Sequence, residues 1–308
     1  MLKREDIRIR DPFILTDKEQ GCYYMYGTTA LVADSIAARG TFSVYRTVDL
    51  ENFEEPKVIV DSDKLGFWGR FDFWAPEVHK YNGAYYMFTT YLNAKTNHRG
   101  CTIMKSDSPE GPFVEITGGH ITPADWDAID GTFYVDPDGQ PWMVFVHEWT
   151  SMPRNVGSFA AAKLSDDLTH FVSEPFELFS ANEPYWTRAS GLHITDGCWL
   201  YTTQSGELLM TWSNFCEEGY AVAQVRSSNG RLDGEWSHVD MLYTRSMTEE
   251  NRYDGGHAMT FTARDGQMYL SFHSPNGGIG NRYETPVFLA VREENDRLVW
   301  DEPRPTHN

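Results

Sequence analysis

The chain is poor in cysteine, in basic residues and in long apolar runs. Its four cysteines are Cys22, Cys101, Cys198 and Cys216. None of them forms a CxxC pair, so the sequence predicts neither a zinc site nor a dense disulfide framework. Lysine and arginine total 26 against 45 acidic residues, a formal charge of −19, which disfavours nucleic acid and anionic membrane surfaces as partners. No stretch approaches the roughly 20 apolar residues of a membrane span.

A targeting segment and a domain linker are also missing. The N-terminal stretch MLKREDIRIRDPF lacks the apolar core of a signal peptide, so we expect a cytoplasmic protein. No proline- or glycine-rich stretch is long enough to divide the chain. Of the 308 residues, 41% are apolar and 14% aromatic, which suffices for a large core. Residues 1–308 are therefore predicted to form one domain.

What the chain does contain is a repeat. Five segments each have an apolar run, a polar turn ending in glycine and a second run rich in aromatic and aliphatic residues, as in a β-hairpin. The turn glycines are Gly21, Gly83, Gly139, Gly206 and Gly266, separated by 62, 56, 67 and 60 residues. A second strand pair follows each hairpin. The pattern predicts an all-β fold, a five-bladed β-propeller with four-stranded antiparallel blades around a central channel. A sandwich would not predict five copies of one pattern, and no segment has sustained helical periodicity.

Counting back nine or ten residues from each turn glycine gives Asp11, Trp74, Asp130, Asp196 and His257. If these positions are equivalent around the axis, the three carboxylates meet at one mouth of the channel. Aspartate before glycine is also ordinary turn material, so a purely structural role stays open for each acid.

Three carboxylates in close proximity raise one another's pKa, which favours a functional role. Hydrolysis of a glycosidic bond requires one ionised carboxylate to activate water and one protonated carboxyl to protonate the leaving oxygen. The third acid can adjust the pKa of the second.

The segments RDPFIL, FWAPEVHKYNGAYYMF and IDGTFYVDPDGQPWMVF resemble the first three blades of glycoside hydrolase family 43, and the likeness extends blade by blade over the whole chain. The resemblance implies an inverting hydrolase with Asp11 as general base, Asp130 as pKa modulator and a fourth-blade glutamate, in a Glu-Gly-Pro motif, as general acid. Inversion predicts a distance of about 6.5 to 9.5 Å between the base and acid carboxyls.

The chain departs from that pattern at the acid. Asp196-Gly197-Cys198 replaces Glu-Gly-Pro, and aspartate is one methylene shorter with a lower reference pKa of about 3.9. Position and motif favour Asp196, and Glu148 and Glu77 are the rival acids. For Glu77, a structural role within its blade is the favoured interpretation.

Six further residues are candidates for sugar contacts. Aromatic rings suit the C–H face of a sugar, although core packing would satisfy them equally. Polar side chains suit its hydroxyl groups. The candidates are Phe73 and Trp74 at the cavity mouth, with Glu148, Arg188, His257 and His273 as polar partners. The resemblance also implies that His257 lies near the axis, where it could help to hold a structural Ca²⁺. No cofactor is required for the chemistry.

The expected partner is an oligosaccharide. The resemblance implies release of α-L-arabinofuranose from short oligosaccharides as the first choice and a β-xylosidase as the second. A galactosidase or galactofuranosidase, and a glycan-binding propeller without turnover, are the remaining alternatives, because a fold does not define its substrate.

Overall fold

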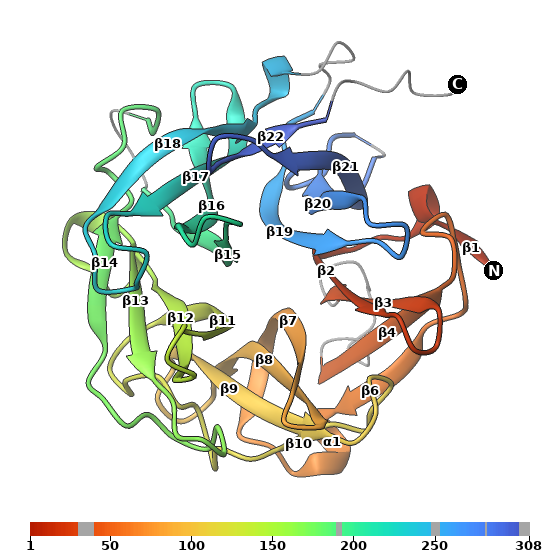
Figure 1. Cartoon of the computed structure of the whole chain (residues 1–308). Helices are drawn as coiled ribbons and strands as arrows, with labels where there is room; N and C mark the ends of the chain where they lie inside the picture. Colours follow the sequence, from red (N-terminus) through yellow and green to blue (C-terminus); the bar gives the residue numbers. More distant parts are fainter. Residues whose placement is uncertain (30–39, 189–192, 248–252, 281, 302–308) are drawn as a thin grey trace.

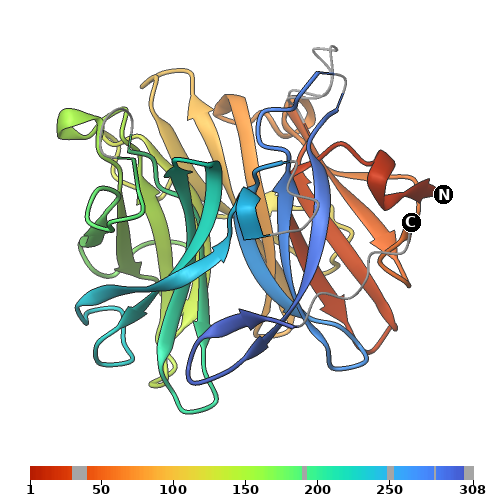
Figure 2. The same ribbon diagram turned by 90° about the horizontal axis from the view of Figure 1, so that it is seen from above.

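A computed structural model describes residues 1–29, 40–188, 193–247, 253–280 and 282–301. The strands form five antiparallel sheets in a ring around a central axis, and Figure 1 looks along that axis. Figure 2 shows the ring from its edge, with the strands running between two faces. This confirms the predicted five-bladed β-propeller.

The blades are numbered 1 to 5 in chain order. Blade 1 contains β1 (Leu2–Lys3), β2 (Arg10–Asp17), β3 (Cys22–Thr28), β4 (Thr41–Thr47), β5 (Asn52–Phe53) and β6 (Lys57–Asp61). Blade 2 contains β7 (Gly69–Tyr81), β8 (Ala84–Asn93), β9 (Arg99–Ser106) and β10 (Val114–Glu115). Blade 3 contains β11 (Ala128–Val135), β12 (Pro141–His147), β13 (Ser158–Lys163) and β14 (Phe176–Ser180). Blade 4 contains β15 (Asp196–Thr202), β16 (Leu208–Cys216), β17 (Gly219–Ser227) and β18 (Trp236–Tyr243). Blade 5 contains β19 (Gly256–Thr262), β20 (Met268–Ser274), β21 (Thr285–Glu293) and β22 (Leu298–Trp300).

Helices make a small contribution. The α-helix α1 (Ser62–Leu65) joins blades 1 and 2, and short 3₁₀ segments occur at Arg4–Asp6, Pro153–Asn155 and Arg245–Met247. Among the described residues, no helix has the length and apolar character needed to cross a bilayer.

The first two strands of each blade form the repeated hairpin, with the first strand nearest the axis (Figure 1). The five turn glycines all have positive φ, between 66° and 96°. Residues with a Cβ rarely adopt this conformation, and this explains why glycine recurs at each turn.

Apolar side chains fill the space between neighbouring blades. Trp212 of blade 4 is fully buried and meets Phe159 and Phe179 of blade 3 with ring centroids 5.6 and 5.4 Å apart. Truncating a buried ring of this size to alanine costs about 3 to 5 kcal/mol of stability. Such contacts fix the angular positions of the blades, and hence of the inner strands.

Each sheet consists of strands that are consecutive in the chain, so among the described strands none of blade 5 pairs with one of blade 1. Individual hydrogen bonds join the two blades instead. Ser271 Oγ donates to the carbonyl of Pro12 at 2.6 Å, and Thr16 Oγ1 donates to the carbonyl of Thr262 at 2.9 Å. The amide of Ile9 donates to the carbonyl of Glu284 at 3.0 Å. These bonds bring the first and last inner strands together at the axis.

Candidate active site

Each inner strand contains a β-bulge, where pairing with the second strand skips two residues. The first skipped residue has a positive φ in every blade: Asp11 (54°), Ala75 (45°), Asp130 (54°), Gly197 (59°) and His257 (55°). Four of the five are not glycine, and such left-handed backbone costs on the order of 1 kcal/mol or more. Strain of this kind concentrates at functional sites, and the bulges fix three ionisable side chains there.

In four of the five junctions, the amide at the bulge is bound by a second-strand side chain of the preceding blade. Thr28 Oγ1 accepts from Ala75 at 2.8 Å, Thr90 Oγ1 from Asp130 at 3.0 Å, Ser213 Oγ from His257 at 2.8 Å, and His273 Nδ1 from Asp11 at 3.2 Å. The last of these bonds joins blade 5 to blade 1 and closes the ring.

The remaining junction, between blades 3 and 4, uses Asp130. In blade 3, the second-strand residue at the position of Thr28 is Val146, because Val146 pairs with Ile129 just as Thr28 pairs with Arg10. A valine side chain has no hydrogen-bond acceptor. Asp130 Oδ2 instead accepts the amide of Gly197 at 3.1 Å. The side chain of Asp130 therefore links blade 3 to blade 4 at the residue that follows Asp196.

The predicted equivalence of the five positions is wrong for two of them. Asp196 pairs with Ser213 just before the bulge, and Trp74 likewise precedes the bulge of blade 2. Counting from the turn glycine does not detect where the bulge falls. Gly197 takes the bulge position in blade 4, where an added Cβ would lie 2.7 Å from His257 Cα.

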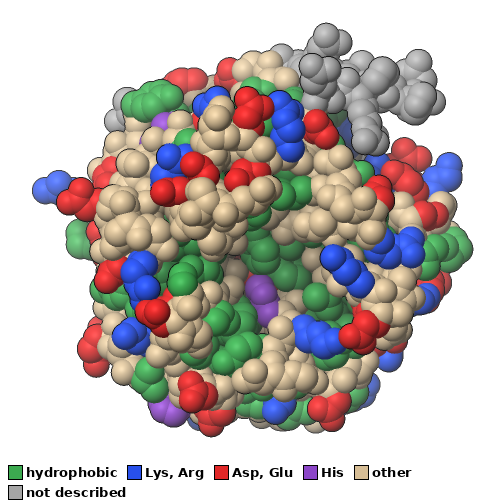
Figure 3. Space-filling view, viewed as in Figure 1, with side chains coloured by type: hydrophobic (Ala, Val, Ile, Leu, Met, Phe, Trp, Pro, Cys, Tyr) green, Lys and Arg blue, Asp and Glu red, His purple; other side chains and the backbone are tan. Residues whose placement is uncertain are grey.

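A cavity of about 490 Å³ lies at the end of the channel that the bulges surround. Its volume is in the usual range for a small-molecule site. All five blades contribute to its wall: Arg10, Asp11, Thr28, Trp74, Arg99, Ile129, Asp130, Glu148, Trp149, Thr150, Ile194, Asp196, Phe215, Tyr220, His257, Asn276 and Gly277. In the axial view of Figure 3, the molecular surface is hollowed near the centre of the ring.

Asp11 is held as a carboxylate. Burial acts to raise its pKa, but the neighbouring His257 and Arg10 and a hydrogen bond from Thr28 outweigh burial, and the pKa of Asp11 falls below its ordinary value. Nδ1 of His257 lies 3.2 Å from Oδ1, and Thr28 Oγ1 donates to Oδ2 at 2.6 Å. His273 contributes through its bond to the Asp11 amide rather than through charge, because burial lowers the pKa of His273 to about 3.

The pKa values of Asp196 and Asp130 are raised, in contrast to that of Asp11. Burial, followed by repulsion from Asp130, raises the pKa of Asp196 to about 8. A hydrogen bond from Tyr220, whose hydroxyl lies 2.8 Å from Asp196 Oδ2, limits the rise. Burial and the charge of Asp11 raise the pKa of Asp130 well above its ordinary value. One cavity thus contains one carboxyl with a lowered pKa, that of Asp11, and two with raised pKa values, those of Asp196 and Asp130.

Glu148 lies in the same cavity on a separate wall. Burial raises its pKa to about 7, against the effect of Arg99. Arg99 bonds to Glu148 at 3.1 Å and to Asp72 at 3.1 Å, and its guanidinium lies 5.0 Å from the ring centre of Trp74. Glu148 is therefore tied to a positively charged neighbour, unlike Asp196.

The profile of Glycosyl hydrolases family 43 matches residues 6–292. The chain belongs to this family. Among solved structures, it is similar to an endo-arabinase from Bacteroides thetaiotaomicron, with 35% identity and a TM-score of 0.80 over 96% of this chain and 98% of that one. A thermostable family-43 glycoside hydrolase has the same fold, with 22% identity and a TM-score of 0.83 over 97% and 95% of the two chains.

Two relatives known by sequence match over shorter lengths. An extracellular endo-α-(1→5)-L-arabinanase of Bacillus subtilis is 22% identical over 60% of this chain and 57% of its own. An extracellular exo-α-(1→5)-L-arabinofuranosidase of Cellvibrio japonicus is 30% identical over 35% of this chain and 31% of its own. Both matches span less than two thirds of the relative.

The structure of this family 43 chain corrects three predicted sugar contacts. Phe73 is buried against Phe42 and Tyr91 and does not line the cavity. Arg188 also lies outside the cavity wall, with Nε bonded to the carbonyl of Cys216 at 3.0 Å. His273 is fully buried behind Asp11 and is not a wall residue.

The other predicted residues do lie in the cavity wall, namely Asp11, Trp74, Asp130, Glu148, Asp196 and His257. Glu77 has the predicted structural environment. It is buried, accepts a hydrogen bond from Thr132 at 2.7 Å and lies 3.0 Å from His79 Nε2.

Sequence reasoning missed the residues that surround the acids. Tyr220, Thr28 and Asn276 lie in second or third strands, or in the loop after β20, and no repeat count points to them. Arg10 was within reach of prediction, since it immediately precedes Asp11 in the RDPF motif. Arg99 carries no local signal in the sequence.

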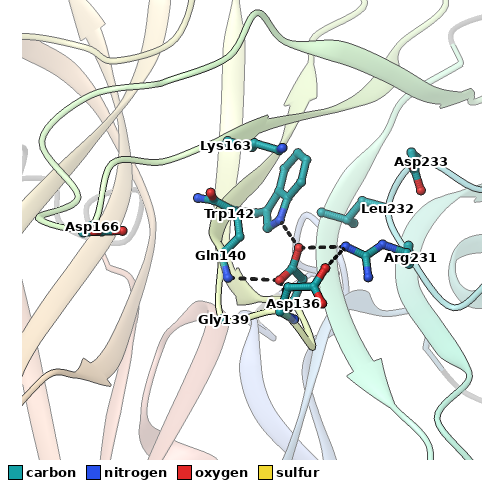
Figure 4. Close-up of a pocket in the computed structure, with 10 residues that line it drawn as sticks. Asp136, Gly139, Gln140, Trp142, Lys163, Asp166, Arg231, Leu232 and Asp233 are labelled. Carbon is teal, nitrogen blue, oxygen red and sulfur yellow. Dashed lines mark hydrogen bonds and ion pairs between the residues drawn. The ribbon is translucent and has the colours of Figure 1, made fainter.

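A second cavity, also of about 490 Å³, lies at the turn end of β11 and β12, at the opposite end of β11 from Asp130. Figure 4 shows Arg231 of blade 4 beside Asp136 of blade 3. Arg231 Nη2 lies 3.4 Å from Asp136 Oδ2 and 2.6 Å from Asp138 Oδ2. The Trp142 indole donates to Asp136 at 3.0 Å. Hydrogen bonds from Trp142 and from the backbone, together with the charge of Arg231, lower the pKa of Asp136 despite its burial. The ion pairs of Arg231 with Asp136 and Asp138 form a clamp between blades 3 and 4.

The predicted structural Ca²⁺ has few protein ligands available. Calcium takes six to eight oxygen ligands, and beside His257 the carboxylates of Asp11 and Asp130 already lie 3.2 and 3.5 Å from its Nδ1. Within the described ranges, no group of three or more acidic, histidine or cysteine side chains forms a metal site. These residues do not by themselves fit a calcium ion, and no step below uses one.

Proposed function

We propose that this family 43 protein is an inverting glycoside hydrolase that releases α-L-arabinofuranose from short oligosaccharides. The observation that carries the proposal is the pair of carboxyl groups with separated pKa values in one cavity. Asp11 has a lowered pKa and Asp196 has a pKa of about 8. Between these two values, one group is a base and the other an acid, as single displacement requires.

In the proposed reaction, a water molecule attacks the anomeric carbon while Asp11 takes its proton. The bond from that carbon to the leaving oxygen breaks, and Asp196 gives its proton to that oxygen. Asp130 stabilises the protonated form of Asp196, because repulsion between the two acids raises the pKa of Asp196. Protein dipoles and the low dielectric of the cavity replace bulk water around these charges.

The choice of sugar rests on similarity. The Bacteroides thetaiotaomicron structure, described as an endo-arabinase, is 35% identical over nearly the full length. The two relatives known by sequence are described as an arabinanase and an arabinofuranosidase. Trp74 and Trp149 lie in the cavity wall, and aromatic rings suit the C–H surface of a sugar. Similarity of sequence supports arabinose without deciding between exo and endo cleavage.

The decisive experiment is hydrolysis of an aryl glycoside panel: α-L-arabinofuranoside, β-D-xyloside, β-D-galactoside and β-D-galactofuranoside. The wild type is compared with Asp11→Asn and Asp196→Asn. Activated aryl groups need little acid assistance, so we expect a loss of at least about a hundredfold for Asp11→Asn and a smaller loss for Asp196→Asn. On arabino-oligosaccharides, the two losses should become comparable.

Proton NMR during the first minutes of the reaction determines the stereochemistry. The proposed mechanism produces β-arabinofuranose first from an α-linked substrate. An initial α product would contradict single displacement. Preference for another sugar in the panel would replace arabinose, and absence of turnover on aryl and natural substrates would favour a glycan-binding propeller.

A further inference from the structure

Asn276 lies in the loop after β20 and lines the catalytic cavity next to Arg10 and Asp11. The backbone around it is anchored. Its amide donates to Asp254 Oδ1 at 3.2 Å, and the amide of Gly277 donates to Glu284 Oε1 at 3.0 Å. Arg10 also lies 3.7 Å from Glu284. The position of Asn276 is thus fixed before any ligand enters.

The backbone amide of Asp11 determines which atoms donate and which accept in the hydrogen bonds around Asn276. A backbone amide can only donate, so His273 Nδ1, 3.2 Å from the Asp11 amide, is the acceptor. The pKa of His273 is lowered to about 3 by burial, so the ring is neutral and its proton is on Nε2. Nε2 then donates to Asn276 Oδ1 at 3.2 Å.

Arg10 completes the assignment. A guanidinium has no acceptor, so its Nη2, 3.2 Å from Asn276, must also face the amide oxygen. Both neighbours therefore engage Oδ1, and the NH₂ group of Asn276 is left with two protons to donate. Among the residues that the structure describes, none accepts a hydrogen bond from this NH₂ group.

We propose that Asn276 is a specificity-determining residue, whose NH₂ group donates a hydrogen bond to one hydroxyl of the sugar bound against Asp11. The inference rests on the proposed function, because it places the reacting sugar in this cavity. His273 acts as a positioning residue in this arrangement, since it binds the backbone of the base on one side and orients Asn276 on the other.

A neutral hydrogen bond to a sugar hydroxyl contributes about 0.5 to 1.5 kcal/mol, which corresponds to roughly two- to tenfold in kcat/KM. The test pairs Asn276→Ala with aryl α-L-arabinofuranosides that lack the 2-, 3- or 5-hydroxyl. We expect the variant to lose roughly two- to tenfold on the parent sugar and on two of the deoxy analogues. On the analogue without the partner hydroxyl, the variant and the wild type should differ by less than about twofold.

Asn276→Asp is the second variant. It keeps an oxygen facing Arg10 and His273 but removes the NH₂ donor, and should give the same pattern if the alanine variant is unstable. Asn229→Ala is the matched control, since Asn229 lies exposed on the β17–β18 turn, away from the cavity. It should behave as the wild type on every substrate.

The outcomes separate the inference from the proposed function. An equal loss on all analogues, or no loss on any, overturns the role of Asn276 even if the wild type is an active arabinofuranosidase. If the panel identifies a different sugar, the deoxy series is made from that sugar. If the wild type has no turnover, the proposed function fails, and the same comparison is made by calorimetry with L-arabinose and its deoxy analogues. Absence of binding, or uniform affinities, then overturns the inference.

Discussion

Replacing Tyr220 by phenylalanine isolates the hydrogen bond that limits the pKa of Asp196. The Tyr220 hydroxyl donates to Asp196 Oδ2 at 2.8 Å, and this bond favours the ionised form. The tyrosine ring is buried beside Phe215 and His273, with centroid distances of 5.4 and 5.8 Å. Phenylalanine preserves these contacts, so the substitution removes the hydroxyl alone.

The magnitude follows from the loss of one hydrogen bond to a charged group, about 1.5 to 3 kcal/mol. One pKa unit corresponds to about 1.4 kcal/mol, so the pKa of Asp196 should rise by about one to two units. In the proposed mechanism Asp196 acts in its protonated form, so we expect activity below its pKa and loss of activity as the pH rises through about 8 in the wild type. In Tyr220→Phe, the alkaline limb of kcat/KM should move to higher pH by that amount.

The assay is the pH dependence of kcat/KM on an arabino-oligosaccharide, where the leaving group needs the acid. Tyr201→Phe is the matched control. Its hydroxyl donates to Glu293 at 2.8 Å, and neither residue lines the cavity. The reasoning is refuted if the alkaline limb of Tyr220→Phe stays in place or moves to lower pH while that of Tyr201→Phe is unchanged.

Three further predictions test other parts of the site and the fold. Glu148→Gln should leave the alkaline limb near pH 8, since the pKa of Asp196 produces it; a profile without that limb would make Glu148 the acid. Thr28→Val removes the bond to Asp11 and the acceptor for Ala75. It should lower the free energy of unfolding by about 1 to 3 kcal/mol in denaturant titration. It should also move the acidic limb of kcat/KM to higher pH, because Asp11 is active above its pKa and the lost bond lowered that pKa; an unchanged limb would contradict this role. Arg231→Ala should cost less than about 1 kcal/mol in the same titration, as for exposed ion pairs, and leave kcat/KM unchanged; reduced kcat/KM would link the clamp to the active site.

The fold and the two bulge acids were within reach of sequence reasoning. Repeated hairpins and their turn glycines define the blades, and counts of ten and nine residues back from the turn glycine place Asp11 and Asp130 at equivalent positions of blades 1 and 3. Asp196 and Trp74 precede their bulges, and no residue type marks that one-residue difference.

The residues that orient the acids could not have been predicted in the same way. Tyr220 and Asn276 reach the cavity from a third strand and from a loop. Their partners, Asp196 and Arg10, belong to inner strands, one in the same blade and one in another blade. Which side chain meets which depends on strand register and blade rotation. A repeat period fixes neither of these quantities.

The use of Asp130 as a bridge between blades 3 and 4 affects how an inactive carbohydrate-capture reagent should be made from this protein. Alanine at position 130 would take away the acceptor of the Gly197 amide, and Val146 has no side-chain acceptor to replace it. Among the residues that the structure describes, no backbone amide of a neighbouring blade donates to the carboxyl of Asp11 or Asp196. The proposed mechanism therefore predicts that asparagine at either position suppresses turnover of oligosaccharides and leaves the propeller ring joined. An affinity matrix for the carbohydrate that this protein binds is therefore best built on those two positions.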